Sequence, residues 1–342
     1  MHILFPFISF RLCVCFMLIL TLAPSSLLAA EPLVVYSGRA ERLIKPVLDV
    51  FTKETNIPVQ LLTGSSTQLV NRLEAEGPHT PADVYLTNDA GTLERAHELR
   101  LLKPLQIEGI EQMVPQAFRA ADNSWIGLSG RVWIIVYNTS MINPEQITSI
   151  LDLANPKWKG KLAIPNAGSE YLQAGVSVIS AVQGETITEA FLKGIRDNAE
   201  NSVYGQSSQI VDAVAKGKVG LGLVNHYYIY RYLADHPKAP IAPLLTDQKK
   251  GEMGLIMNAT GIGVLTHTKR LKEAKSLVQF LISRTGQQMF SERNKEYPIR
   301  PTVKADPALP PRKSFRVAQV PLARLAELRE PTMLLIERSG LR

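Results

Sequence analysis

Cysteine is almost missing from this 342-residue sequence, whose two cysteines, Cys13 and Cys15, both lie within the first 30 residues. If that segment is removed, the remaining chain has no thiol for a disulfide, a thiolate metal site or a cysteine nucleophile. The sequence also lacks a P-loop, an H-E-x-x-H motif and a G-x-S-x-G motif. GLGLVN at positions 220–225 matches only part of a dinucleotide-binding fingerprint. These absences argue against an enzyme.

Long apolar runs are missing after residue 30, so the sequence predicts no membrane span there. The first 30 residues hold one charged side chain, Arg11, followed by an apolar run from Leu12 to Leu22 and small residues from Ser25 to Ala30. This order is typical of a secretory signal peptide. We therefore expect cleavage near Ala30 and an exported chain that begins at Glu31.

Dense basic runs are missing too, although the formal net charge is +7. Losing Arg11 with the signal peptide leaves +6, and the lysines and arginines are scattered along the chain. No nucleic-acid-binding motif accompanies this charge, so we expect no nucleic-acid partner. An exported basic protein is attracted to anionic ligands or to an anionic membrane surface, and charge alone does not choose between them.

Short apolar segments alternate with amphipathic ones in the first part of the mature chain. The segments LVVY (33–36), IPVQLL (57–62) and ADVYLT (82–87) predict strands, and apolar residues at helical spacing follow each one. This alternation implies right-handed crossovers and a mainly parallel sheet. Ligands of such sheets bind where the strands end, here near Gly38, Ser65 and Asn88. The sequence therefore predicts an α/β fold.

The rest of the chain continues the same pattern. The segment GLSGRVWIIVYN (127–138) holds a continuous apolar strand from Val132 to Val136, and ATGIGVLT (259–266) is another strand. Helical patterns cover 169–181, 186–196 and 208–216, and a buried strand is expected at 219–224. A proline-rich surface connection precedes a final amphipathic helix.

Four of the ten tyrosines fall within NHYYIYRY (225–232). A phenol with a pKa near ~10 ionises at neutral pH only beside a cation, and ferric iron is a hard ion that favours oxygen anions. Asn225 is a good N-cap, which places Tyr227 and Tyr228 in a first helical turn, where the helix dipole stabilises an ionised oxygen. The competing interpretation is core packing, which we favour for Tyr230 and Tyr232. A strand-to-helix junction favours a cleft position for the first pair.

Five segments, taken in order, carry a resemblance to a known family. They are VVYSGRAERLIKPVLDVFTKETNIPVQLLTGSSTQLVNRLEAEGPHTPADVYLTNDAG, GLSGRVWIIVYN, DLANPKWKGKLAIPNAG, AVAKGKVGLGLVNHYYIYR and NKEYPIRP. As a set, running from about Leu33 to Pro301, they resemble the ferric-ion-binding proteins of bacterial iron ABC importers. Each segment alone is a weak signal.

The resemblance implies a two-lobed periplasmic-binding-protein architecture (type II) with a ligand cleft between the lobes. Lobe 1 is then expected to comprise 31–131 and 262–342, and lobe 2 to comprise 132–261. The chain is expected to cross between the lobes near 131–138 and near 258–263.

The resemblance also implies a function. Members of the family close their lobes over Fe(III) in the periplasm and deliver it to an inner-membrane permease driven by a cytoplasmic ATPase. Tyr227 and Tyr228 match the family's paired iron-binding tyrosines, and Tyr171 in AGSEYLQ matches a third tyrosine of some members. We expect a monomeric transport protein whose metal, Fe(III), is its cargo.

The first lobe departs from the family pattern. Members often carry a histidine, or a histidine and a tyrosine, where this chain has Ala40 and Glu41, and many have a glutamate where it has Asn88 and Asp89. The first-lobe contacts to the metal are then expected from water, a carboxylate such as Asp89, or an anion. Such an anion, for example carbonate, would be held near Arg39 or Arg131.

Several of these residues also have structural interpretations, and a rival ligand class stays open. Asp89 suits a helix cap, Arg39 a solvated helix start and His226 a buried structural role, while Tyr36 is a further candidate to line the cleft. The same fold also binds organic or oxyanion ligands such as a phosphonate, a sugar phosphate or a polyamine. Arg39 and Arg131 would hold an anion, whereas a polyamine needs more carboxylates than Asp89.

Overall fold

The computed structural model describes residue 2 and residues 31–342, and Pro32–Arg342 forms one compact unit. The predicted signal peptide, with Cys13 and Cys15, lies outside the described residues. Within the described part of the chain, no helix has the length and apolar character needed to cross a bilayer.

The strands of the described chain form a single sheet in the order β2-β1-β3-β9-β4-β7-β5-β6, and β8 and β10 each pair with β4. The strands are β1 (Leu33–Ser37), β2 (Val59–Thr63), β3 (Val84–Thr87), β4 (Trp125–Asn138), β5 (Leu162–Pro165), β6 (Val203–Tyr204), β7 (Leu221–Asn225), β8 (Ile241–Leu244), β9 (Ile256–Val264) and β10 (Tyr297–Pro298). Pairing is parallel at both ends of the sheet, among β2, β1 and β3 and among β7, β5 and β6.

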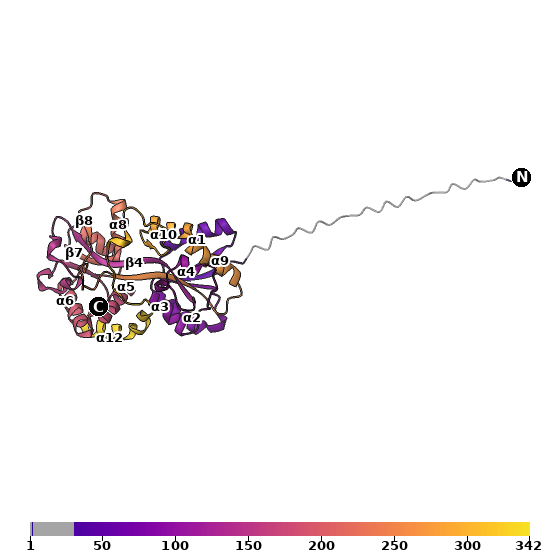
Figure 1. The fold of residues 1–342 in the computed structure, drawn as a ribbon, viewed down its shortest axis with the longest axis horizontal. Coiled ribbons are helices and arrows are strands. Elements are labelled where there is room, and N and C mark those ends of the chain that lie inside the picture. The colour runs from indigo at the N-terminus through magenta and orange to yellow at the C-terminus, as the bar shows by residue number, and fades with distance from the viewer. Residues whose placement is uncertain (1, 3–30) are drawn as a thin grey trace. The chain divides into compact units, whose positions relative to one another are not determined.

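Two long antiparallel strands, β4 and β9, join these ends (Figure 1). The first half of β4 lies beside the half of β9 that pairs with β3, and the second half of β4 pairs with β7. We call the part built on β1 to β3 the first lobe and the part built on β5 to β7 the second lobe. Arg131 pairs with Asn258 where the two strands pass between them.

The helices are α1 (Glu41–Thr55), α2 (Ser66–Glu76), α3 (Ala90–Glu98), α4 (Ile110–Met113), α5 (Glu170–Gln183), α6 (Glu185–Ala199), α7 (Ser207–Ala215), α8 (His226–Asp235), α9 (Leu271–Ile282), α10 (Arg284–Asn294), α11 (Arg324–Glu327) and α12 (Arg329–Ser339). In the first lobe, α1, α9 and α10 share a core with one face of the sheet. The opposite face packs on α2 and α3, because neighbouring side chains of a strand point to opposite faces. In the second lobe, α7 and α8 cover one face and α5 and α6 the other.

The predicted alternation of strands and helices is confirmed, with corrections to its middle. A mainly parallel sheet was the expectation, but β4 runs antiparallel to β9, β7 and β8. The predicted apolar strand Val132 to Val136 is only the second half of β4. The first half contains Gly127 and Gly130, which weaken a strand pattern although the strand passes through both with a local irregularity.

The C-terminal segment contacts both lobes. α11 packs on α3 of the first lobe, whereas α12, which the sequence assigns to lobe 1, packs on α5 and α6 of the second. The segment before α11 pairs with the β9 side of the sheet through Leu255 and Val317.

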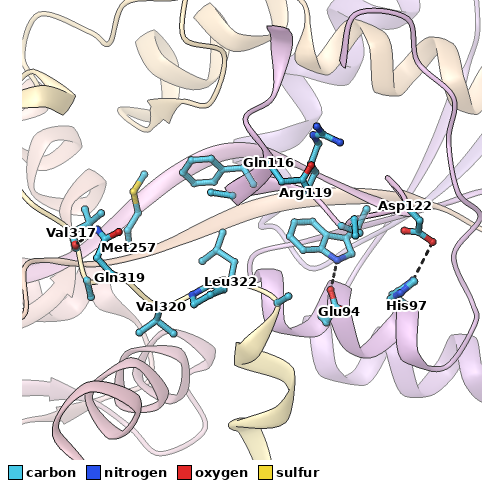
Figure 2. Close-up of a pocket in the computed structure, with 18 of the residues that line it drawn as sticks. Glu94, His97, Gln116, Arg119, Asp122, Met257, Val317, Gln319, Val320 and Leu322 are labelled. Carbon is cyan, nitrogen blue, oxygen red and sulfur yellow. Dashed lines mark hydrogen bonds and ion pairs between the residues drawn. The ribbon is translucent and has the colours of Figure 1, made fainter. Parts of the chain in front are cut away.

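A cavity of about 830 Å³ lies between this segment and the sheet, lined by Trp125, Met257, Leu322 and their neighbours (Figure 2). On its wall, the Trp125 indole donates to Glu94 at 2.6 Å, and His97 bonds the neighbouring Ser124 at 2.8 Å. None of the site residues predicted from the sequence lines this cavity.

Candidate functional site

Tyr227 and Tyr228 stand in the first turn of α8, directly after β7, as the sequence predicts. Their rings lie 4.3 Å apart between centroids, and Tyr227 is only 1% exposed. Asn225 occupies the N-cap position but makes no side-chain capping bond. Its side-chain nitrogen Nδ2 is buried and has no hydrogen-bond partner among the described residues. The helix start is therefore set by the strand-to-helix turn rather than by the expected Asn225 cap.

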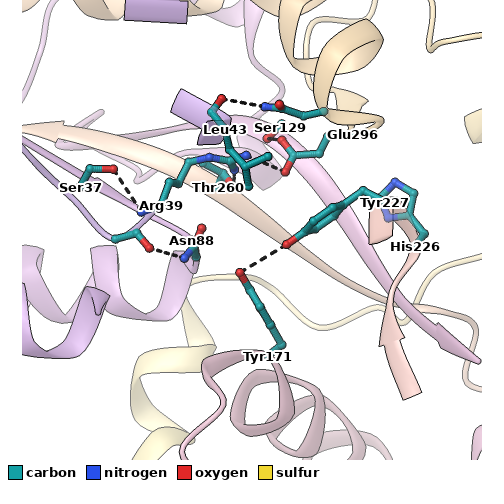
Figure 3. A network of polar contacts seen from close by, with 12 residues as sticks. Ser37, Arg39, Leu43, Asn88, Ser129, Tyr171, His226, Tyr227, Thr260 and Glu296 are labelled. Carbon is teal, nitrogen blue, oxygen red and sulfur yellow. Dashed lines mark hydrogen bonds and ion pairs between the residues drawn. The ribbon is translucent and has the colours of Figure 1, made fainter. Parts of the chain in front are cut away.

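Tyr171 reaches the same point from a different helix. It is the second residue of α5, which Ser169 caps by accepting a hydrogen bond from the Leu172 amide at 3.4 Å. Its hydroxyl lies 3.4 Å from that of Tyr227 (Figure 3). The structure thus brings together the three tyrosines that the sequence singled out, from the beginnings of two helices.

Two phenols of this cluster, Tyr171 and Tyr227, hold their protons at neutral pH. Burial, followed by the neighbouring phenols, raises the pKa of Tyr227 well above its ordinary value. Burial and then Tyr228 raise the pKa of Tyr171, and the positive charge of Arg131 opposes the shift without overcoming it. A cation that takes these oxygens as phenolates has to displace protons.

Arg131 is buried beside the phenols without a hydrogen bond to its guanidinium. The side chain is 1% exposed, and none of its three nitrogens has a hydrogen-bond partner among the described residues. Its terminal carbon lies 5.2 Å from the centroid of the Tyr171 ring. A buried charge of this kind is costly unless an opposite charge neutralises it, so the site suits anionic oxygen, whether phenolate or a bound anion.

Arg39 is placed differently from the solvated helix start that was one expectation. It is 1% exposed and forms a buried ion pair with Glu296 at 2.8 Å, while its second terminal nitrogen donates to Thr260 (Figure 3). Glu296 also accepts from Ser129 at 2.6 Å. The pair therefore ties the loop after β1 to both strands that join the lobes. Only the Arg39 Nε stays without a partner, which leaves Arg131 as the better anion contact.

Asp89 and Tyr36 lie outside the tyrosine cluster. Asp89 caps α3 by accepting from the Thr92 amide at 2.8 Å, and it also accepts from Asn258 at 2.9 Å. Its helix-cap interpretation is correct, and both its oxygens are engaged. The Tyr36 hydroxyl donates to Glu76 at 3.1 Å, and Arg72 covers its ring.

His226 packs as a neutral side chain next to the cluster. Its Nδ1 accepts from the Val132 amide at 3.2 Å, and its ring stacks on Tyr297 with centroids 4.9 Å apart. Burial lowers the pKa of His226 to about 3. It is therefore a structural histidine that links α8 to β4.

A cavity of about 410 Å³ opens between the lobes at Tyr171 and Tyr228. Its first-lobe wall is built from the strand ends that the sequence predicted, together with the start of α1: Gly38, Ala40, Arg42, Ser65 and Asn88. Its second-lobe wall is built from Pro165, Gly168, Ser169, Glu170, Tyr171, Gly205, Gln206, Ser207, Ser208 and Tyr228. The side chains of these walls are mostly polar and small.

Sequence reasoning missed three functional candidates here. Arg42 lines the cavity from the first turn of α1, and Glu296 pairs with Arg39. Glu170 accepts a hydrogen bond from Ser66 of the first lobe, and burial together with the charge of Asp89 raises the pKa of Glu170. All three residues stand in segments quoted above. The partners of Glu296 and Glu170 are distant in the sequence, so no local pattern indicates these contacts. Among the described residues, no group of three His, Cys, Asp or Glu side chains is placed to hold a metal ion.

Comparisons with known proteins give one family. The family model for bacterial extracellular solute-binding proteins matches residues 33–293. An Fe(3+)-binding periplasmic protein of Serratia marcescens is 32% identical over 299 residues, covering 87% of each chain. Iron uptake protein A1 of Synechocystis is 30% identical over 311 residues, covering 90% of this chain and 86% of that protein.

The fold agrees with a solved structure of similar length. The Trichodesmium protein IdiA (FutA), determined in complex with iron and citrate ligands, superimposes with a TM-score of 0.79 at 29% identity. The match covers 91% of this chain and 100% of that one.

Proposed function

The chain belongs to the bacterial extracellular solute-binding proteins, and from this premise we propose that it captures Fe(III) in the cleft between its lobes. Its relatives include an Fe(3+)-binding periplasmic protein and an iron uptake protein. Tyr171, Tyr227 and Tyr228 are the proposed ligands. The observation that carries the proposal is the 3.4 Å approach of two phenol oxygens from separate helices, next to a third phenol and an unpartnered arginine.

The chemistry of the donor set suits a hard trivalent cation. Three phenolates balance three positive charges, so closing the cleft over the complex buries little uncompensated charge. Because three phenolates only balance the charge of Fe(III), the positive charge of buried Arg131 beside them remains, and a bound anion would neutralise it. An anion such as carbonate beside Arg131 would complete the coordination from the first-lobe side.

The lobes and partners form the second part of the proposal. Lobe 1 comprises 31–131 and most of 262–342, lobe 2 comprises 132–261, and α12 belongs with lobe 2 because it packs on α5 and α6. The protein acts in the periplasm as a monomer that transports iron without catalysing a reaction. It delivers iron to an inner-membrane permease coupled to a cytoplasmic ATPase.

A titration of the metal-stripped protein with ferric citrate tests the proposal. We expect a visible phenolate-to-iron absorption band that saturates near one iron per chain. The band should disappear in a Tyr227→Phe, Tyr228→Phe double variant and persist in Tyr230→Phe, a control on the same helix. A colourless titration of the wild type would contradict iron binding through tyrosine and would favour an oxyanion ligand at Arg131.

A further inference from the structure

Glu170 extends from the second lobe to the first. It is the first residue of α5, immediately before Tyr171, and its carboxylate accepts hydrogen bonds from Ser66 Oγ at 3.0 Å and from the Thr67 amide at 3.3 Å. Ser66 and Thr67 begin α2 of the first lobe. Both bonds therefore cross the cleft, at residues next to its cavity.

The start of α2 is suited to receive a carboxylate. The first amides of a helix have no partner within the helix and carry its positive dipole end. Ser65 accepts from one of them, the Gln68 amide, at 3.1 Å, and Glu170 accepts from another. The α2 start is therefore capped partly by its own chain and partly by the opposite lobe.

Other contacts fix Ser66 and Thr67, the donors of these two bonds. Ser66 is fully buried, and its carbonyl accepts from the Tyr85 hydroxyl at 2.5 Å. The loop after β1 lies directly against this hydroxyl, because a Cβ atom at Gly38 would overlap Ser66 Oγ, and the Asn88 amide donates to the same oxygen at 3.4 Å. Arg329, at the start of α12, donates to Thr67 Oγ1 at 2.6 Å. The α2 start is thus held by contacts from both lobes.

We propose that Glu170 is a positioning residue that holds the cleft closed over the metal. The inference rests on the proposed function, because the role given to Glu170, next to Tyr171, is to retain bound iron. Opening the lobes breaks both carboxylate bonds, so Glu170 stabilises only the closed arrangement. It acts through the position of the lobes and does not itself bind the iron.

The rate of iron loss to an excess of a chelator, followed by the fading of the visible band, measures this role. Hydrogen bonds to a charged group are among the stronger ones, so Glu170→Ala should release iron about tenfold faster or more. Glu170→Gln keeps one acceptor oxygen and should fall between Glu170→Ala and the wild type. Glu185→Ala is the matched control, because Glu185 also begins a helix but is paired only with exposed Arg338. Release from this control should proceed at the wild-type rate.

A second pair of variants keeps the test decisive. Ser66→Ala removes the hydroxyl partner from the other lobe, and its effect should not add to that of Glu170→Ala if the two groups act as one contact. Additive effects, or release from Glu170→Ala within twofold of wild type, would overturn the proposal.

Small-angle X-ray scattering separates this inference from the proposed function. The wild-type curve should match the curve calculated from this structure, in which Glu170 joins the lobes, and Glu170→Ala should scatter as a more open particle. If the wild type binds no iron, the proposed function fails, and scattering alone then decides the role of Glu170. Identical curves for the two proteins would overturn the proposed role of Glu170 whether or not iron binds.

Discussion

A guanidinium as deeply buried as that of Arg131 ordinarily has hydrogen-bond partners, but this one has none within the part of the chain that the structure describes. Its neighbours are the phenols of Tyr171 and Tyr227, which become anions only when a cation binds. The charges of Fe(III) and three phenolates cancel, so the buried charge of Arg131 carries an electrostatic cost that a bound anion relieves.

Arg131→Met keeps most of the side-chain volume and removes the charge. It therefore shows separately what this charge does in the metal-free protein and in the iron-bound protein. We expect the metal-free variant to gain about 1 kcal/mol or more in free energy of unfolding, and its iron affinity to fall about tenfold or more. Urea denaturation of the stripped protein and a ferric citrate titration measure the two effects. A variant that loses stability while keeping wild-type affinity would show that Arg131 serves only the fold.

The pH dependence of binding follows from the phenol protons. Burial raises the pKa of Tyr171 and of Tyr227 in the metal-free protein, so both are protonated throughout the range from pH 7 to pH 5. Each phenol that binds iron releases a proton, and a lower pH therefore opposes binding. The apparent affinity, measured by competition with a chelator of known pH dependence, should fall steadily across this range. A flat profile would rule out phenolate ligands.

Local signals at single residues were readable from the sequence, and distant pairs were not. The position of Tyr227 and Tyr228 after a buried strand follows from periodicity and from Asn225, although that side chain makes no cap. The pairing of Arg39 with Glu296 joins residues 257 positions apart. Only the folded sheet brings them together. The sequence therefore leaves Arg39 as a candidate ligand contact, whereas in the structure its terminal nitrogens already bond Thr260 and Glu296.

At the scale of elements, α5 positions both Tyr171 and Glu170. The helix lies close to β4 because Gly175 has no side chain, and a Cβ atom there would overlap the indole of Trp133. Tyr171 precedes Gly175 by four residues, so the two share a helix face. A small residue at this contact thus sets how far the phenol extends into the cleft.

Gly175→Ala should push α5 away from Trp133. We expect a loss of about 1–3 kcal/mol in unfolding free energy from overpacking, with weaker iron binding because Tyr171 moves with the helix. Val182→Ala, at an exposed position of the same helix, should change stability by less than about 0.5 kcal/mol. Chemical denaturation and iron titration of both variants are the measurements, and wild-type behaviour of Gly175→Ala would show that α5 tolerates displacement.

At the scale of the whole molecule, the two strands β4 and β9 determine how the lobes relate. The sequence indicated the α/β alternation of each lobe, because hydrophobic periodicity is local. It did not indicate the antiparallel centre of the sheet or the contacts of α12 with the second lobe, because both depend on packing between distant segments.

Binding in a cleft between lobes also predicts a stability effect. A ligand that binds only the folded protein stabilises it by about 2.7 kcal/mol when its free concentration is 100 times the dissociation constant. Iron loading should therefore raise the melting temperature, and stripping the metal should lower it again. Calorimetry of the loaded, stripped and reloaded protein tests this. Equal melting temperatures would mean that iron does not bind the native fold.

The central claim is that phenolate oxygens from both α5 and α8 bond the iron directly. Resonance Raman spectroscopy of the iron-loaded protein, excited within the visible band, tests it most directly because only vibrations of groups bonded to the absorbing centre are enhanced. We predict enhanced phenolate ring modes that weaken in Tyr171→Phe and are lost in the Tyr227→Phe, Tyr228→Phe variant. A loaded wild-type protein whose spectrum contains no phenolate modes would contradict the account and would place the iron on other oxygen ligands.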